Sequence, residues 1–197
     1  METLINKLIK IEYECFSKTQ NIGGRAKCQD NYDKFYIMRN AQWQSLTSSV
    51  ITSVIEDITK AINDGRNPVS EKYGYMMATY AKDDYDRIKD QLPAISDDKK
   101  SIIESIVNRY IRWYEELVTK YPKMMNNGRY LRTVTDSYCS ISIETYLRCE
   151  LMTYSIHTLL LWQECIDSID YNPVEIIYDY TARSYGYKNS LELENNL

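Results

Sequence analysis

Apolar residues recur at helical spacing along most of the chain. Near the N-terminus, Leu4, Leu8, Ile11 and Cys15 are spaced i, i+4, i+7 and i+11, which predicts an amphipathic helix from about residue 2 to about residue 19. Similar patterns predict helices from Asp30 through Trp43, from Thr47 or Ser48 to Gly65, from Asn67-Pro68, over Asp83–Gln91, from Ser96 to Tyr121, over about Ile141–Ile169, and from Asn172 to about Tyr185.

Helix-ending and helix-starting residues agree with these boundaries. Gly65 suits a helix C-terminus, whereas the Asn-Pro steps at 67–68 and 172–173 suit helix starts. The stretch from about residue 123 to 140 is the longest irregular segment, and the polar tail 188–197 is expected to fray. The sequence therefore predicts one all-α domain over residues 1–197, a bundle of about six to eight helices with two long core helices, 96–121 and 141–169.

Charge and composition narrow the function classes. The 197 residues carry a net charge of −4 and no Lys/Arg block, which argues against nucleic-acid binding. The longest apolar run, Leu159–Trp162, is too short to span a membrane, and the N-terminus lacks the pattern of a signal peptide, so a cytoplasmic location is expected. Five cysteines without a CxxC pair indicate reduced thiols rather than disulfides or a structural zinc site.

Polar residues interrupt the apolar face of the helix predicted over 141–169. Its stripe runs Ile143, Leu147, Glu150, Tyr154, His157, Leu161, so a carboxylate and the only histidine are expected on the buried face. A buried carboxylate requires a partner. Two interpretations stay open at this point: a hydrogen-bonded structural pair, or polar groups lining a pocket between helices.

The segment Asn21–Asp30 holds the only Gly-Gly pair, Gly23-Gly24, together with Arg25, Lys27 and Cys28. Paired glycines allow close backbone approach, so this loop is predicted to hold an anionic ligand group or to dock onto Glu150. Because cations and a helix N-terminus favour the thiolate, Cys28 is also a candidate nucleophile in a pair with His157. The alternative is an inert thiol in a capping turn.

Further acidic residues complete the candidate set. Glu12 lies on the apolar stripe of the first helix with Glu14 close by, and inward carboxylates on facing helices are typical of di-iron bundles. With one histidine and no Glu-x-x-His step, no metal site is expected. Glu144 and Arg148, spaced i, i+4, predict a surface ion pair, or else a clamp on a ligand anion.

Several short stretches together resemble a prokaryotic domain-of-unknown-function family, number four-one-two-five. They run from about Leu8 to Tyr187: Glu12-Tyr13-Glu14, the 21–30 loop, Gly65-Arg66-Asn67, Glu71-Lys72-Tyr73, Lys120-Tyr121-Pro122, Glu144-Thr145-Tyr146-Leu147, Glu150-Leu151 and Thr153-Tyr154-Ser155. The resemblance implies an all-helical fold and a partner resembling a nucleotidyltransferase. The chain itself has no Gly-Ser with paired aspartates, P-loop or GxGxxG motif for nucleotide chemistry.

The leading hypothesis is a pocket between helices for a small anionic or nucleotide-related molecule, belonging to a binding protein or an accessory enzyme domain. Its predicted lining is Glu14, Gly23, Gly24, Arg25, Cys28, Glu144, Glu150, Tyr154 and His157. If a reaction occurs, Cys28, Glu150 and His157 are the catalytic candidates, and the sequence indicates no particular cofactor. The alternative is a non-catalytic interaction module, or a subunit of a larger complex, that leaves Arg25 on the surface.

Overall fold

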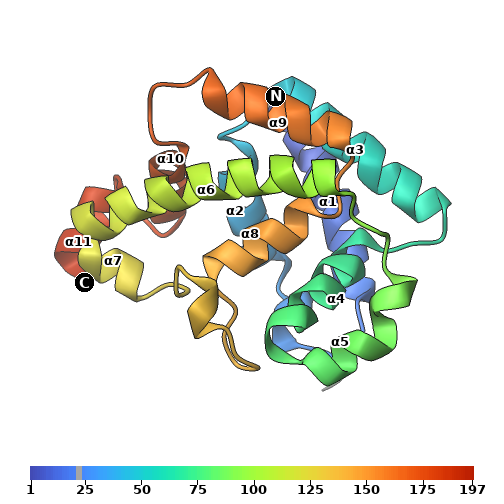
Figure 1. Ribbon diagram of the computed structural model, residues 1–197. Helices are drawn as coiled ribbons and strands as arrows, with labels where there is room; N and C mark the ends of the chain where they lie inside the picture. The colour runs from blue at the N-terminus through green and yellow to red at the C-terminus, as the bar shows by residue number, and fades with distance from the viewer. Residues whose placement is uncertain (21–23) are drawn as a thin grey trace.

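The computed structural model describes residues 1–20 and 24–197, and this part of the chain is all-helical, as predicted (Figure 1). It contains eleven α-helices, more than the six to eight expected, with no β-strand among the described residues. The helices are α1 (Glu2–Lys18), α2 (Tyr32–Trp43), α3 (Ser48–Asn63), α4 (Pro68–Tyr80), α5 (Lys82–Ile88), α6 (Asp97–Lys120), α7 (Pro122–Asn126), α8 (Ile143–Leu151), α9 (Ile156–Asp167), α10 (Pro173–Ser184) and α11 (Ser190–Asn196). Short 3₁₀ turns occupy Lys27–Asp30, Lys89–Gln91 and Thr133–Thr135.

Local signals in the sequence account for most helix ends. The Asn67 side chain accepts hydrogen bonds from the N–H groups of Val69 and Ser70 at the start of α4, with Pro68 in the first position. Gly65 has a φ of +74° just after α3, a conformation that favours glycine. The Asn31 side chain caps α2, and Asp30, at which the sequence pattern began this helix, pairs with Arg25.

The single long helix predicted over 141–169 is wrong, since the chain forms two helices there, α8 and α9. The Ser155 side chain accepts the N–H of Thr158 at the start of α9. From α3, the Asp57 carboxylate accepts the N–H of Ser155 at 2.7 Å and the Thr158 hydroxyl. These bonds turn the chain after Thr153, so the apolar face of α8 does not continue into α9, and His157 is exposed rather than buried.

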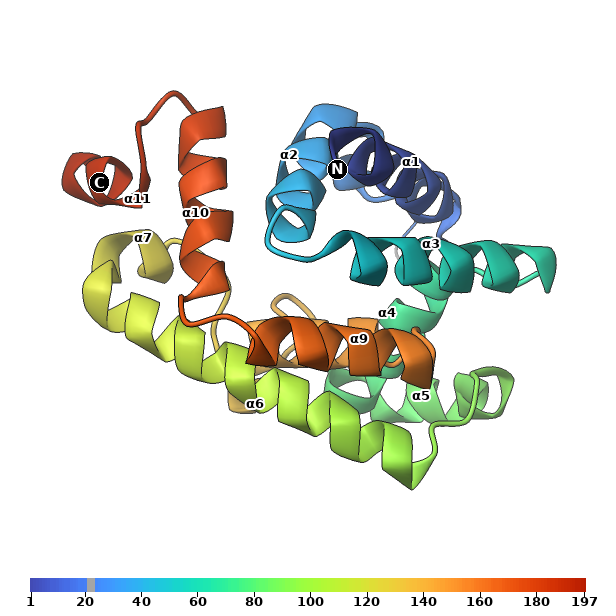
Figure 2. The ribbon, with the colours of Figure 1, turned by 90° about the horizontal axis from the view of Figure 1, so that it is seen from above.

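The elements pack around one main core. Figure 1 shows α6 crossing the molecule, with α9 on one side and α8 on the other; α4 and α5 lie towards one end, α7 and α11 at the other. Seen from above, α9 lies between α3 and α6, and α10 packs against both α2 and α6 (Figure 2). Trp43 and Trp162 are fully buried at the centre, with ring centroids 5.8 Å apart.

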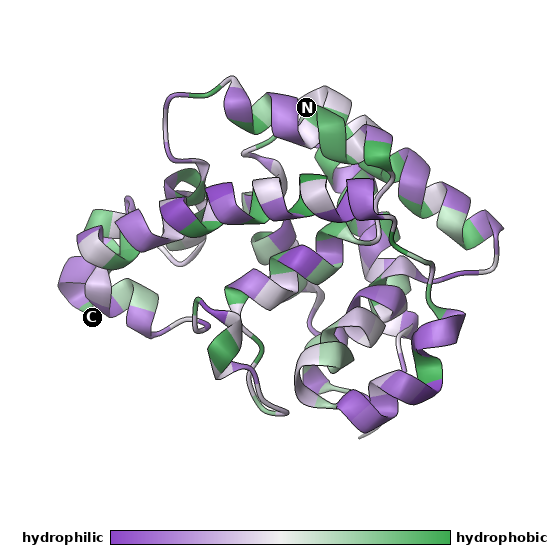
Figure 3. Cartoon of the chain, in the orientation of Figure 1, coloured by the Kyte–Doolittle hydropathy of each residue, from purple (hydrophilic) through white to green (hydrophobic). Residues whose placement is uncertain are grey.

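The hydropathy of the helices agrees with this packing. Polar and apolar residues alternate around the long helices, as expected for amphipathic elements that bury one face (Figure 3). Within the described residues, no helix combines the length and apolar character that crossing a bilayer would require.

The C-terminal segment 188–197, whose polar sequence predicts fraying, contains the short helix α11. Asn189 caps α11, and Ser190 is fully buried with its N–H and hydroxyl bonded to Asp179 of α10. The Glu194 carboxylate accepts the N–H groups of Lys123 and Met124 at the start of α7, at 3.0 and 2.7 Å. Tertiary hydrogen bonds therefore hold a segment whose own sequence is polar.

Candidate functional site

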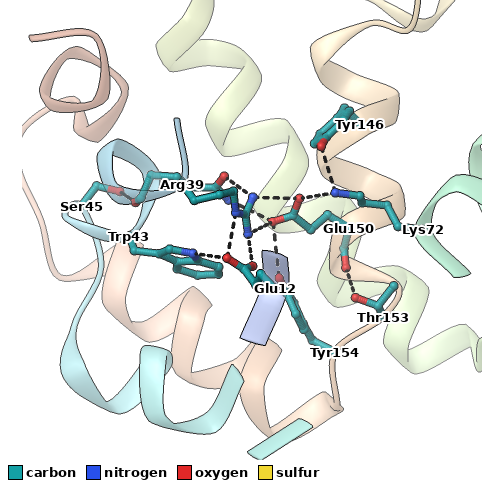
Figure 4. A network of polar contacts seen from close by, with 10 residues as sticks. Glu12, Arg39, Trp43, Ser45, Lys72, Tyr146, Glu150, Thr153 and Tyr154 are labelled. Carbon is teal, nitrogen blue, oxygen red and sulfur yellow. Dashed lines mark hydrogen bonds and ion pairs between the residues drawn. The ribbon is translucent and has the colours of Figure 1, made fainter. Parts of the chain in front are cut away.

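Three helices bring their charged side chains together in the interior. Glu12 comes from α1, Arg39 from α2 and Glu150 from α8, and all three are buried (Figure 4). The Arg39 guanidinium forms two hydrogen bonds to each carboxylate: Nε is 3.0 Å from Glu12 Oε2, Nη2 also contacts Glu12 Oε1, and Nη2 and Nη1 are 3.0 and 3.2 Å from the Glu150 oxygens. Arg39 thus bridges two carboxylates that would otherwise repel each other.

Neighbours on α2 complete the hydrogen bonding of this centre. Trp43 donates its indole N–H to Glu12 at 3.0 Å, and its ring lies 4.8 Å from the Arg39 guanidinium carbon. The Gln42 amide donates to Glu150 at 3.1 Å and accepts from Arg39 at 2.7 Å. The five N–H groups of Arg39 are therefore all used.

Lys72 of α4 supplies the second cation. Its ammonium lies 3.3 Å from Glu150 and 2.9 Å from the Tyr146 hydroxyl of α8, and 4.4 Å from the centre of the Tyr146 ring. The Tyr154 hydroxyl donates to Glu150 at 3.4 Å. Two carboxylates and two cations balance, so the cluster of Glu12, Arg39, Lys72 and Glu150, here called the buried charge network, is neutral overall.

Electrostatics keeps Glu150 and Lys72 ionised. Burial on its own would raise the pKa of Glu150, but the charges of Arg39 and Lys72 outweigh it and lower that pKa to about 2. Burial opposes the charged form of Lys72, yet Tyr146 and Glu150 raise its pKa above the usual value. Glu150 is therefore a carboxylate at neutral pH with its oxygens already engaged, so it is not poised to donate a proton.

The space beside the network is small. A cavity of about 20 Å³ is lined by Glu12, Cys15, Arg39, Ile58, Pro68, Val69, Lys72, Glu150, Thr153 and Tyr154. A cavity of this size holds about one water molecule. This cavity therefore has no room for a metabolite. Among residues 1–20 and 24–197, no group of three or more His, Cys, Asp or Glu side chains is placed to hold a metal ion.

The residues predicted to line one pocket are not brought together. Glu150 and Tyr154 are in contact, as their spacing on one face suggested, but Glu14 and His157 are exposed. Glu144 accepts the N–H of Thr133 at 2.9 Å and pairs with Arg148 at 3.0 Å, so it anchors the segment before α8.

In the described part of the loop after α1, Arg25 bonds to neighbouring residues of the chain rather than to Glu150. Arg25 is half exposed, pairs with Asp30 at 2.6 Å and donates to the carbonyl of Ser17 at 2.7 Å. Gly24 has a φ of +84°, whereas Gly23 lies outside the described residues. An open surface groove of about 450 Å³ runs along Ser17, Lys18, Thr19, Gln20, Gly24 and Arg25. Of the two predicted roles of this loop, docking onto Glu150 is not seen for Arg25, which Asp30 engages instead, and the holding of an anionic ligand group stays a prediction.

Cys28 is exposed in the 3₁₀ turn that precedes α2. It lies near Tyr73 of α4, whose pKa is raised by burial, by Tyr146 and in small part by Cys28. His157, by contrast, is exposed at the start of α9. The structure gives no Cys28–His157 pair.

The predicted site residues did not include Arg39, Gln42, Lys72 or Tyr146. One signal was available: Arg39 lies midway between Phe35 and Trp43 at i, i+4 spacing, so it interrupts an apolar face just as Glu12 does. Lys72 similarly lies four residues after Pro68 and four before Met76, which are both buried. Opposite charges on the apolar faces of different helices, such as Glu12 and Arg39 or Glu150 and Lys72, are the pattern expected of buried ion pairs.

These features define a class: an all-helical protein whose core contains a neutral network of four charges joined by hydrogen bonds. The chain belongs to the family described as protein of unknown function (DUF4125), whose family model matches residues 2–195. The resemblance found in the sequence is thereby confirmed. No curated protein and no solved structure gives a significant match to the chain.

Proposed function

We propose that this protein binds a small anionic molecule at the outer end of the buried charge network, where Lys72 of α4 meets Tyr146 of α8. The observation that carries the proposal is the state of Lys72. Its ammonium is held charged in the interior, with a side-chain exposure of 10%, and bonds to two acceptors although it has three N–H donors. Arg39, by contrast, has no donor to spare.

The groups around Lys72 favour an anion. Arg129, an exposed residue between α7 and α8, lies with its guanidinium carbon 5.1 Å from the centre of the Tyr146 ring. Because the buried charge network is neutral, Arg129 gives this region a positive charge. The phenols of Tyr73 and Tyr146 add hydrogen-bonding groups close to Lys72. A carboxylate or phosphate group approaching from this side would meet two cations and two phenols.

The competing interpretation treats the network as structural only. Glu12, Arg39 and Glu150 join α1, α2 and α8, and a satisfied buried network of this kind is a common device for fixing how helices pack. This interpretation accounts for Arg39 fully. It predicts that no small anion stabilises the protein, which makes the two interpretations separable by one type of measurement.

The test is the shift of the thermal unfolding midpoint with inorganic phosphate, acetate and AMP as probes. A probe present at about ten times its Kd should stabilise the native protein by about 1.4 kcal/mol. We expect the shift to disappear in Arg129→Gln and Tyr146→Phe, and in Lys72→Met if that variant folds. Lys99→Met is the matched control, because Lys99 is also partly buried and donates to the carbonyl of Met152 at 2.6 Å.

The outcomes are distinct. Stabilisation of the wild-type and Lys99→Met proteins, but not of Arg129→Gln, supports the proposed site. A stronger effect of AMP than of phosphate would place the ligand among nucleotides. If none of the three anions shifts the wild-type midpoint, or if Arg129→Gln responds as the wild type does, the proposal is refuted and the network is structural.

A further inference from the structure

We infer that the molecule bound at the small-anion site carries a planar ring, and that this ring packs on the tyrosine pair Tyr80 and Tyr138. The inference rests on the small-anion site proposed above and adds the part of the ligand that lies beyond its anionic group. Lys72 and Arg129 hold the anionic group, whereas Tyr138 selects among anions by the ring that they carry.

The tyrosine pair presents a fixed ring to solvent. Tyr80 is the last residue of α4 and Tyr138 lies in the segment before α8; their ring centroids are 5.1 Å apart and the ring planes meet at 74°. The Tyr138 hydroxyl donates to Asp84 of α5 at 2.9 Å. These two contacts fix the orientation of the Tyr138 ring although the residue is 66% exposed. Planar rings stack on an exposed aromatic face of this kind.

The tyrosine pair is continuous with the small-anion site. Tyr73 and Tyr80 are seven residues apart on α4, so they lie on one face of the helix, about 10 Å apart along its axis. The Lys72 ammonium lies 5.4 Å from the centre of the Tyr73 ring. Tyr73 and Tyr80 pack against one small group of buried side chains, as does Tyr146 of the anion site. This group is Tyr75, Met76 and Cys149.

Arg129 joins the anion site to the segment that carries Tyr138. Its Nη1 donates to the carbonyl of Ile141 at 3.1 Å, and the Ile141 side chain packs against the same buried group as Tyr80. The cation and the exposed ring are thus held on neighbouring parts of one short segment. A ligand whose anionic group contacts Arg129 can therefore extend along this surface to the ring of Tyr138.

Charge differs between the two ends of this surface. Lys72 and Arg129 supply cations at one end. At the other end, the Asp84 carboxylate accepts hydrogen bonds from Tyr138 and Arg87, both at 2.9 Å. A carboxylate repels an anionic group but accepts hydrogen bonds from N–H and O–H groups. The surface therefore fits an anion joined to a ring that donates hydrogen bonds, a chemistry that nucleotides with an amino-bearing base and hydroxyaryl acids share.

The experiment compares two pairs of probes whose members differ by the ring: AMP with ribose 5-phosphate, and 4-hydroxyphenylacetate with acetate. Dissociation constants for the full-length protein are measured by NMR chemical-shift titration. Stacking on one aromatic side chain corresponds to about a 5- to 150-fold gain in affinity, and we expect this gain in at least one pair. A gain for AMP identifies nucleotides as the ligands, and a gain for 4-hydroxyphenylacetate identifies hydroxyaryl acids.

The variant Tyr138→Ser tests the residue that contacts the ring. The gain in affinity should disappear in this variant, while ribose 5-phosphate and acetate bind as they do to the wild type. Tyr185→Ser is the matched control, because it removes another exposed tyrosine, at the end of α10, and it should keep the gain. Since both side chains are more than half exposed, both variants should keep the wild-type circular dichroism spectrum and unfolding midpoint.

The results separate this inference from the proposed function. Equal affinities within both pairs, or a gain that persists in Tyr138→Ser, would overturn the inference and leave the small-anion site in place. If no probe binds, or if Arg129→Gln leaves the affinity for ribose 5-phosphate and acetate unchanged, the small-anion site itself is refuted and the inference falls with it.

Discussion

Arg39 determines how the interior of this protein tolerates two carboxylates. A single buried carboxylate without a partner would cost several kcal/mol or become protonated. Here one planar guanidinium bonds both Glu12 and Glu150, and Lys72 balances the remaining charge. Such a network is often no more stabilising than well-packed apolar residues of similar volume. Removal of one charged member is nevertheless strongly destabilising, because its partner is left buried and unpaired.

The pH dependence of stability tests whether Glu150 is ionised in the folded protein. Its pKa of about 2 lies below the value of 4.5 for a free glutamate, so its stabilising contribution is complete above pH 4.5 and is lost as the pH falls towards 2. The 2.5-unit difference corresponds to about 3 kcal/mol. We expect the gap in free energy of unfolding between wild type and Glu150→Gln to narrow by about this amount between pH 5 and pH 2, measured by urea denaturation.

Glu56→Gln is the control, since Glu56 is exposed on α3. The gap between this variant and the wild type should stay nearly constant over the same pH range. A constant gap for Glu150→Gln as well would mean that Glu150 is not held as a buried carboxylate.

At the scale of the helices, short-range signals predicted much of the fold, and long-range contacts explain the errors. Asn67-Pro68 and Gly65 act on neighbouring residues, so their effects could be read from the sequence. The break between α8 and α9 depends on Asp57, which is 98 residues from Ser155 along the chain. The apolar pattern continues across that break and gives no sign of it.

The same difference between short-range signals and long-range contacts applies to the candidate site. The position of Glu150 on an apolar face predicted a buried carboxylate with a partner, and the structure confirms this. The identity of the partner, Arg39, could not be deduced, because the two residues are 111 positions apart. Docking of the loop that carries Arg25 onto Glu150 was only one of two predicted roles, and the sequence could not decide between them, because spacing along one helix says nothing about which other helix faces it.

The start of α9 offers a test of the break. In Ser155→Ala, the cap for the Thr158 N–H is lost, which should cost about 1 kcal/mol of folding stability. Ser101→Ala is the control, because Ser101 is exposed on α6. Chemical denaturation should show the control unchanged or slightly stabilised, since alanine favours helix formation. Equal stability of Ser155→Ala and wild type would mean that Asp57 alone defines the start of α9.

Across the whole molecule, the central helices and the end that carries α7 and α11 are held in place by different interactions. The central helices are joined by the apolar core and the buried charge network. At the C-terminal end of the chain, hydrogen bonds attach α11 to α10 and α7. The Glu194 carboxylate is the link to α7, since it satisfies two backbone N–H groups that α7 cannot satisfy itself.

Replacement of Glu194 by alanine should therefore loosen one end of the protein while leaving its centre intact. Hydrogen bonds to a charged group typically contribute about 1.5–3 kcal/mol, and we expect a loss in this range for local opening of α7 and α11. Native-state hydrogen exchange should show faster exchange at Lys123 and Met124, with unchanged protection in α6 and α9. Asn195→Ala, at an exposed neighbouring position, should leave exchange as in the wild type. Uniformly faster exchange in Glu194→Ala would instead show that α11 stabilises the molecule as a whole.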